Sequence, residues 1–183
     1  MLQTIGRQAK QAEPILRTLH TMEKDRALRQ VAEDLLARQD EILAANEIDV
    51  KAGREAGLSE GLLDRLALDP ERIASMAEGL RQLADLDDPI GEISAMKERP
   101  NGLLIGQKRV PLGVVGIIYE ARPNVTADAF GLCFKTSNAV ILKGGSVAIH
   151  SNRAIVECIR SSLAKCQITP DAIQFIDDTS REI

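Results

Sequence analysis

The chain has 183 residues, a formal net charge of −4 and only 2% aromatic residues. This length can bury one good core, or a helical layer against a small sheet. No basic run is present and aromatic stacking platforms are few, so binding to nucleic acid or to an anionic membrane has little support. The N-terminus, MLQTIGRQAK, has no apolar signal region and no stretch is long enough to span a bilayer. We therefore expect a cytoplasmic protein.

Residues 1–95 have the pattern of a charge-rich helical layer. Apolar residues recur there at helical spacing: Leu28, Val31, Leu35, Ile42 and Leu43. Ser59 predicts the cap of a short helix, and Asp69-Pro70 predicts the start of another, with Asp as N-cap and Pro at the first helical position. No catalytic constellation is visible in this region, so its charges indicate a solvated face and its leucines a packing stripe.

Residues 96–112 are predicted to form a β-hairpin. Pro100-Asn101-Gly102 lies between two extended segments, ISAMKER and LLIGQKRV, and Asn-Gly in such a position favours a hairpin turn. Both edges of this hairpin would be exposed and able to pair with another chain. We therefore expect an oligomerisation segment here.

Residues 113–183 have an α/β pattern. Strands are predicted at 114–119, 139–143 and 173–176, and helices at about 125–136 and 147–164. This β-α-β-α-β order is half of a doubly wound, Rossmann-like sheet. The strands are rich in Val and Ile without alternation, which predicts parallel strands covered on both faces.

Two strand ends are expected at the same edge of this sheet, where α/β proteins bind ligands. The first is the segment 119–124, and the second is Lys143-Gly144-Gly145-Ser146. The lysine supplies a positive charge, the glycines allow close backbone approach, and Ser146 could cap the next helix, whose N-terminus favours an anion. A phosphate-bearing ligand fits this pattern, although GxGxxG and P-loop motifs are absent.

Ordinary structural roles for the same residues remain open. Asn124 or Thr126 could cap the helix that follows the first strand. Lys143 could extend from its strand end into water while the glycines form the turn.

The cysteines and histidines do not indicate a metal site or a disulfide framework. Three cysteines, Cys133, Cys158 and Cys166, form no CxxC pair and have no nearby histidine. No positioned base or charge partner is visible to activate a thiol, so these cysteines are interpreted as small core residues.

One continuous segment, RVPLGVVGIIYEARPNVTADAFGLCFKTSNAVILKGGSVAIHSN, resembles the γ-glutamyl phosphate reductases (glutamate-5-semialdehyde dehydrogenases) of the aldehyde dehydrogenase superfamily. YEARPNVT and ILKGGS carry the resemblance most specifically, and it extends over the whole chain. It implies NADPH-dependent reduction of L-glutamyl 5-phosphate to L-glutamate 5-semialdehyde, with release of phosphate, in proline biosynthesis. Functional coupling to glutamate 5-kinase is a further implication.

The resemblance also implies roles for individual residues. Asn124 matches the asparagine that donates its amide to the oxyanion, which is the donor that acyl reduction requires. Glu120 and Arg122 would lie close by as substrate-binding residues, and Arg122 suits an acidic substrate or a cofactor phosphate. Ile118, Gly144 and Gly145 would contact the cofactor, and Lys143 would contact its ribose or 2′-phosphate. The position where NAD-preferring relatives often carry a glutamate is Ser146, which favours NADP.

The nucleophilic cysteine of this family belongs to a downstream catalytic domain and is absent from this chain. We therefore expect an N-terminal piece of the reductase that does not turn over by itself. The alternative is a non-catalytic protein that retains the fold for oligomerisation or regulation.

Overall fold

The computed structural model describes residues 1–178; the last five residues of the predicted 113–183 unit lie outside the described residues. The helical prediction for the first part of the chain is confirmed. Its helices are α1 (Leu2–Thr18), α2 (Thr21–Ala37), α3 (Gln39–Glu55), α4 (Glu60–Leu66) and α5 (Pro70–Asp85).

The two predicted helix starts have different outcomes. Asp69 is the N-cap of α5, its Oδ1 accepts a hydrogen bond from the Arg72 amide at 2.7 Å, and Pro70 is the first helical residue. Ser59 occupies the N-cap position of α4, but its side chain makes no capping hydrogen bond. The helix start was therefore predicted correctly in both places, and the side-chain cap in only one.

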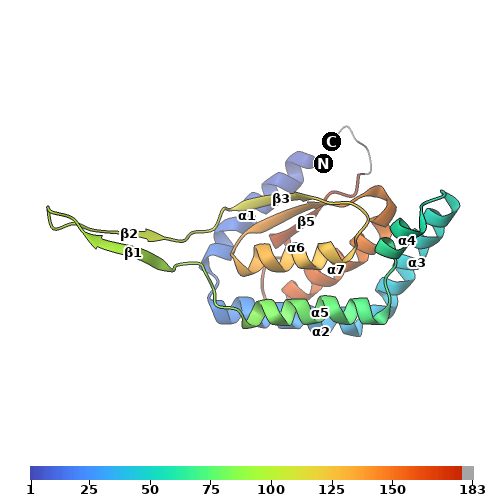
Figure 1. The fold of residues 1–183 in the computed structure, drawn as a ribbon, viewed down its shortest axis with the longest axis horizontal. Helices are drawn as coiled ribbons and strands as arrows, with labels where there is room; N and C mark the ends of the chain where they lie inside the picture. Colours follow the sequence, from blue (N-terminus) through green and yellow to red (C-terminus); the bar gives the residue numbers. More distant parts are fainter. Residues whose placement is uncertain (179–183) are drawn as a thin grey trace.

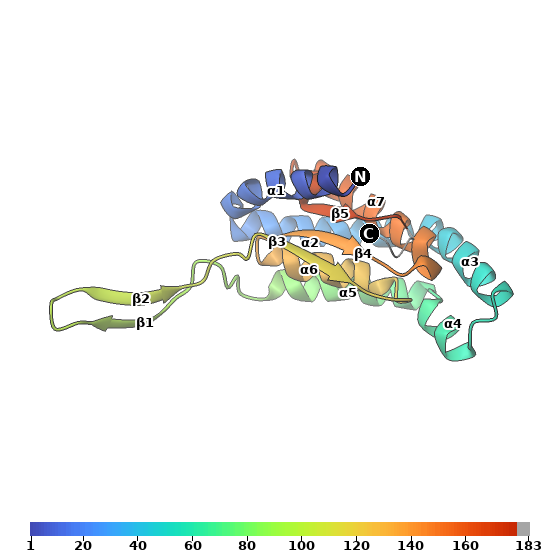
Figure 2. The same cartoon turned by 90° about the horizontal axis from the view of Figure 1, so that it is seen from above.

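The predicted hairpin extends away from the rest of the molecule (Figures 1 and 2). Strands β1 (Ile93–Glu98) and β2 (Leu104–Lys108) pair antiparallel, so the predicted division at 95/96 falls inside β1. Arg99 and Leu103 close the turn through a 2.8 Å backbone hydrogen bond, and Gly102 has a φ of 81°. The loop is therefore three residues long, with glycine in the left-handed position, rather than a two-residue Asn-Gly turn.

The predicted α/β unit is confirmed as a parallel sheet in the order β3-β4-β5. Its elements are β3 (Val114–Ile118), α6 (Asn124–Lys135), β4 (Ala139–Lys143), α7 (Ile149–Lys165) and β5 (Ile173–Phe175). In Figure 1, α6 and α7 lie below the sheet, and α2 and α5 form a further layer below them. Helix α1 packs against β4 and β5.

The expectation that all these strands are covered on both faces is wrong for β3. The central strand β4 is largely buried, whereas Gly116 and Ile118 of β3 are exposed, Ile118 by 84%. Strand β3 lies at the edge of the sheet, and its neighbouring residues Val115 and Ile117 pack against the core instead. The Val/Ile run therefore has one covered and one open face.

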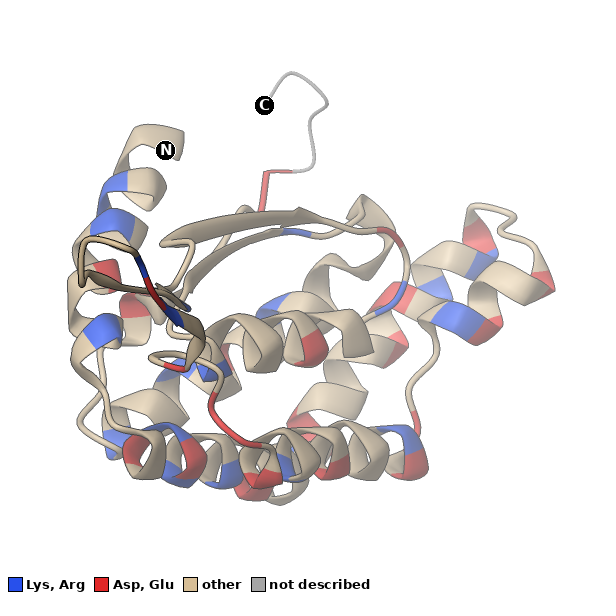
Figure 3. Cartoon of the chain, turned by 60° about the vertical axis from the view of Figure 1, so that its left-hand side comes forward, with Lys and Arg blue, Asp and Glu red and all other residues tan. Residues whose placement is uncertain are grey.

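The core lies between the sheet and the helices below it. Phe130 and Phe134 of α6 stack at a centroid distance of 5.2 Å within this core. Charged residues of both signs alternate along the outer helices, while the sheet carries few of them (Figure 3). None of the helices in residues 1–178 combines the length and the apolar character needed to cross a membrane.

Candidate functional site

The two strand ends singled out in the sequence lie next to each other. Ile118 and Lys143 are register partners on β3 and β4, and the Tyr119 amide donates to the Lys143 carbonyl at 3.1 Å. A Cβ placed on Gly145 would lie only 3.3 Å from the carbonyl carbon of Glu120. The loops that follow the two strands are therefore in contact, and residues from both form one edge of the sheet.

The open face of the sheet reaches this edge at Ile118. Gly116 and Ile118 point to the same side of β3 because they alternate with the covered residues. Lys143, the register partner of Ile118, brings a positive charge to the same row. An apolar surface with a lysine beside it suits a ligand that has a flat hydrophobic part and an anionic part.

The glycines after β4 are explained by contacts within the chain. A Cβ on Gly144 would collide with Nδ2 of the buried Asn152 and would lie 3.2 Å from Cζ of Tyr119. Gly145 lies against the main chain of Glu120. Close packing of the two loops therefore requires small residues here, whether or not a ligand approaches.

The predicted cap of the following helix by Ser146 is wrong. Ser146 is exposed, begins a short 3₁₀ turn and does not cap α7. Instead, the buried carboxylate of Asp49 in α3 accepts hydrogen bonds from the His150 and Ser151 amides at 3.3 and 2.8 Å. The Ser151 hydroxyl also donates to Asp49, at 2.6 Å. A carboxylate of the chain itself therefore accepts the hydrogen bonds of these two amides at the start of α7.

A buried hydrogen-bonded chain connects the first strand end to α7. Thr126 Oγ1 donates to Asn152 Oδ1 at 3.0 Å and lies 2.6 Å from the Tyr119 hydroxyl. Because the Thr126 hydrogen is used on Asn152, the Tyr119 hydroxyl donates to Thr126 Oγ1. Burial raises the pKa of Tyr119 to about 12, so its hydroxyl keeps its proton at neutral pH. Asn152 Nδ2 has no partner among the described residues. These three side chains fix the start of α6 relative to α7.

Neither Asn124 nor Thr126 caps α6, so that alternative is wrong. The helix begins at Asn124, and Asn124 Nδ2 donates to Asp128 Oδ2 at 3.2 Å, one turn further along. Thr126 is committed to the buried chain described above. Asn124 is half-buried and lies beside a cavity, where its amide can reach a ligand.

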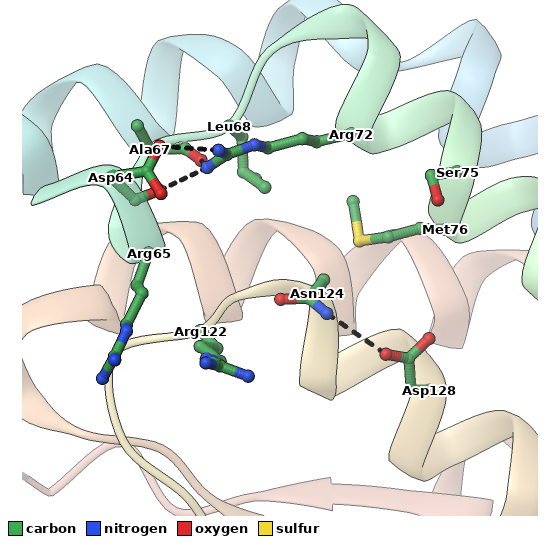
Figure 4. Close-up of a pocket in the computed structure, with 10 residues that line it drawn as sticks. All are labelled: Asp64, Arg65, Ala67, Leu68, Arg72, Ser75, Met76, Arg122, Asn124 and Asp128. Carbon is green, nitrogen blue, oxygen red and sulfur yellow. Dashed lines mark hydrogen bonds and ion pairs between the residues drawn. The ribbon is translucent and has the colours of Figure 1, made fainter. Parts of the chain in front are cut away.

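This cavity lies between α4, α5 and the first turn of α6 and has a volume of about 340 Å³. Its wall includes Arg65 from α4 and Arg122, Asn124 and Asp128 from the region of α6 (Figure 4). A neighbouring recess of about 90 Å³ shares Arg65 and Arg122 and extends to Tyr119 and Glu120. The loop after β3 therefore contributes both to this cavity and to the recess beside it.

The charged groups of the cavity are only partly paired. Arg72 donates to Asp64 at 2.7 Å and to the Ala67 carbonyl at 2.7 Å. Arg65 and Arg122 are both exposed, and neither guanidinium has an ion pair or hydrogen bond within residues 1–178. Their charges are available to an anion.

Asp128 completes the cavity and was not anticipated from the sequence. Burial raises the pKa of this carboxyl, and the hydrogen bond from Asn124 opposes the shift only in part. A signal existed, because residues four apart on a helix are neighbours and Asn124 and Asp128 have that spacing. No local sequence pattern indicated a site role for Arg65, because its position is typical of a charged residue on the solvated face of a helix.

The cysteines have the core role expected of them. Cys133, Cys158 and Cys166 are all buried and unpaired by disulfides. Burial raises the pKa of each thiol, that of Cys158 to about 11. None is a thiolate nucleophile in this setting. Among residues 1–178 no group of three or more His, Cys, Asp or Glu side chains is arranged to hold a metal ion.

No protein-family model matches the chain. Curated relatives do match: the chain is 57% identical over 178 residues to γ-glutamyl phosphate reductase of Heliobacterium modesticaldum, covering 97% of this chain and 43% of that protein. It is 53% identical over 182 residues to the γ-glutamyl phosphate reductase of Lachnospira eligens, covering 100% of this chain and 44% of that protein. The chain thus spans less than half the length of these relatives.

Solved structures agree with this similarity. The crystal structure of γ-glutamyl phosphate reductase from Thermotoga maritima matches 99% of this chain and 44% of its own, with a TM-score of 0.95 and 42% identity. The Saccharomyces cerevisiae structure matches 97% of this chain and 46% of its own, with a TM-score of 0.90 and 30% identity. More distant aldehyde dehydrogenases share the fold, such as one from Listeria monocytogenes with a TM-score of 0.74 and 14% identity. The resemblance indicated by YEARPNVT and ILKGGS is confirmed.

Proposed function

Because this chain is homologous to the γ-glutamyl phosphate reductases over nearly its whole length, we propose that it contributes to NADPH-dependent reduction of L-glutamyl 5-phosphate. The product is L-glutamate 5-semialdehyde, phosphate is released, and the reaction belongs to proline biosynthesis in the cytoplasm. The single observation that supports this most is the contact between the two strand ends, where Ile118 pairs with Lys143 and Glu120, on the loop that leads to Asn124, lies against Gly145.

The open sheet face fits a nicotinamide dinucleotide. Ile118 offers an exposed apolar surface, and Lys143 is its register partner on the next strand. NADPH, when bound there, supplies the hydride. Ser146 is exposed at the same edge and brings no carboxylate, so a 2′-phosphate would meet no repulsion from it. Lys143, with Gly144 and Gly145 shaping the turn, is proposed to hold the adenosine end.

Asn124 is proposed to donate its amide to the oxyanion. Its hydrogen bond to Asp128 uses one of the two Nδ2 hydrogens and holds the amide plane in place. The other hydrogen can then point at a reacting carbonyl oxygen. A donor fixed in advance stabilises developing negative charge without reorganising during the reaction. Arg122 and Glu120, on the same loop, are proposed to contact the substrate.

The attacking thiolate must come from outside residues 1–178, because the thiols described there are buried with raised pKa values. We therefore place nucleophilic attack in a part of the enzyme that this structure does not describe. The described residues would orient the acyl group and the cofactor.

The test is kinetic and uses an enzyme that joins this chain to the remaining portion of a relative. Asn124→Ala should lower kcat about 10²–10³-fold with little change in substrate KM, because an oxyanion donor acts mainly in the transition state. Thermal stability should change little, since Asn124 caps no helix. Lys143→Ala is the companion variant and should weaken the binding of NADPH more than the binding of NADH. A destabilised but fully active Asn124→Ala enzyme would remove the catalytic assignment.

A second proposal concerns assembly through the hairpin. All residues of β1 and β2 are exposed, including Ile93, Met96, Leu104 and Ile105, and both edges of the pair are open. We propose that this arm pairs with another copy of the chain. Such pairing would also serve a non-catalytic role in oligomerisation or regulation. Functional coupling to glutamate 5-kinase is part of the same proposal. Light scattering should show a dimer or larger species for this chain, and a monomer for a variant in which the hairpin is shortened to its base. A monomer in both cases would exclude this role.

A further inference from the structure

The cavity between α4, α5 and α6 contains charges of both signs that the fold leaves open. Arg65 and Arg122 have no ion pair within residues 1–178, and Asp128 Oδ1 has no hydrogen bond there. In Figure 4, Arg122 lies between Arg65 and the Asn124–Asp128 pair, so cations and carboxylate follow one another along the wall. By contrast, Arg72 and Asp64 in the same wall neutralise each other. Two open cations and one open carboxylate remain.

This arrangement suits a zwitterion better than a simple anion. A phosphate dianion would be attracted by the guanidinium groups but repelled by the Asp128 carboxylate a short distance away. An α-amino acid carries a carboxylate and an ammonium group on one carbon, so it can satisfy both signs at once. Arginine also binds carboxylates through two parallel hydrogen bonds.

The rest of the wall fits the remainder of such a ligand. Leu68 and Met76 line the cavity and offer apolar contact to methylene groups. The volume of about 340 Å³ is at the small end of the range for ligand sites. Asn124, at the beginning of α6, lines the same cavity beside Asp128, so its second amide hydrogen can face a ligand held there.

We infer that this cavity holds the α-amino-acid end of the substrate, with Arg65 and Arg122 binding its α-carboxylate and Asp128 binding its α-ammonium group. The inference rests on the proposed function and adds two specificity-determining residues, Arg65 and Asp128. It also gives the Asp128 carboxylate beside the proposed oxyanion donor a partner of opposite charge, the ligand's own ammonium group.

The experiment is a set of NMR titrations of the ¹⁵N-labelled chain with three probes. L-Glutamate carries both charged groups, glutarate lacks the ammonium group, and 4-aminobutyrate lacks the α-carboxylate. L-Glutamate should bind at least about tenfold more tightly than either analogue, as expected for loss of a charge-assisted hydrogen bond. The largest shift changes should fall on α4 and the first turn of α6.

Two variants and a matched control sharpen the test. Arg65→Gln should weaken L-glutamate binding about tenfold and make its affinity equal to that of 4-aminobutyrate. Asp128→Asn should make the affinity for L-glutamate equal to that for glutarate. Arg81→Gln is the control, because Arg81 lies on α5 with Glu78 as its partner, away from the cavity wall. Melting curves of all variants exclude unfolding as the cause.

Several results would overturn the inference. Equal affinity for L-glutamate and glutarate would contradict it, and so would chemical-shift changes that fall away from α4 and α6. It would also be contradicted if inorganic phosphate displaced L-glutamate and both variants weakened phosphate binding equally. NADPH binding, followed in the same samples, separates the two proposals. Intact NADPH binding without L-glutamate binding would sink this inference alone, whereas the reverse would sink the cofactor assignment and leave the subsite standing.

Discussion

The two ends of α6 carry charged side chains in opposite surroundings. At the C-terminal end, Lys135 is buried and its Nζ donates to Asp25 at 2.6 Å and to the Ala84 carbonyl at 3.1 Å. Beside it, the ammonium group of Lys24 is 1% exposed and pairs with Asp88 while donating to the Lys135 carbonyl and to Ser137 at 3.1 Å. Both buried lysines at this end therefore have a carboxylate partner.

At the N-terminal end of α6 the guanidinium groups of Arg65 and Arg122 are exposed and have no partner within residues 1–178. Burying an unpaired charge costs several kcal/mol, so the fold can tolerate open charges only where water reaches them. The comparison separates two uses of charge. Paired, buried charges connect the layers of the fold, and open, hydrated charges remain available for a ligand.

The largest expected effect comes from breaking the buried end. Lys24→Met should destabilise the chain by about 3–5 kcal/mol, because Asp88 and the Lys135 carbonyl lose their partner in a buried site. Urea unfolding at neutral pH measures it. Arg29→Met on the same helix removes an exposed pair with Asp85 and should cost about 1 kcal/mol or less. Similar losses for the two variants would mean that burial does not distinguish these charges.

A second test asks whether burial, rather than position along α6, decides the cost. Thr126 lies in the first turn, at the open end, but it is buried and bridges Tyr119 and Asn152. Thr126→Val should cost about 1–3 kcal/mol, because both partners lose a hydrogen bond inside the protein. Thr18→Val is the control, since that exposed hydroxyl bonds only the Ile15 carbonyl. A neutral Thr126→Val would show that this network contributes nothing to stability.

The last test compares the pH dependence of two carboxyl groups, and the shape of the pH profile, rather than the size of the stability loss, is what it measures. Burial would raise the pKa of Asp88, but hydrogen bonds from Lys24 and the Ile90 amide outweigh it, so the pKa is lowered. The pKa of Asp128 is raised by burial. Asp88 therefore contributes stability above its unfolded pKa of about 4, and this is lost as the pH falls through its lower folded value. The contribution of Asp128 is present below about pH 4 and is lost as the pH rises through its higher folded value.

Urea unfolding from neutral to acidic pH checks these signs. Asp88→Asn should lower stability at neutral pH and flatten the loss of stability in acid. Asp128→Asn should raise stability at neutral pH relative to the parent chain and change little in acid. If both variants shift stability in the same direction at neutral pH, the assigned pKa directions cannot both hold.

Local sequence signals predicted the elements well, because they depend on residues close together in the chain. Asp69 and Pro70 start α5 through a cap and a fixed φ within one turn. The Pro100-Asn101-Gly102 turn needs only one residue that accepts a positive φ, which is Gly102. The Val/Ile runs and the short YEARPNVT and ILKGGS motifs likewise predicted the parallel strands and the family.

Only the tertiary structure decided which faces and charges are open, because that depends on contacts between distant segments. The run from Val114 to Ile118 cannot reveal that it forms an edge strand with one uncovered face. Nor does the sequence near α7 show that Asp49, about a hundred residues earlier, already fills its N-terminus. Arg65 and Asp128 lie at one cavity for the same reason: the packing of α4 and α5 over α6 brings them together across 63 positions of sequence. Spacing along the chain determines local geometry, whereas packing decides which side chains water and ligands can reach.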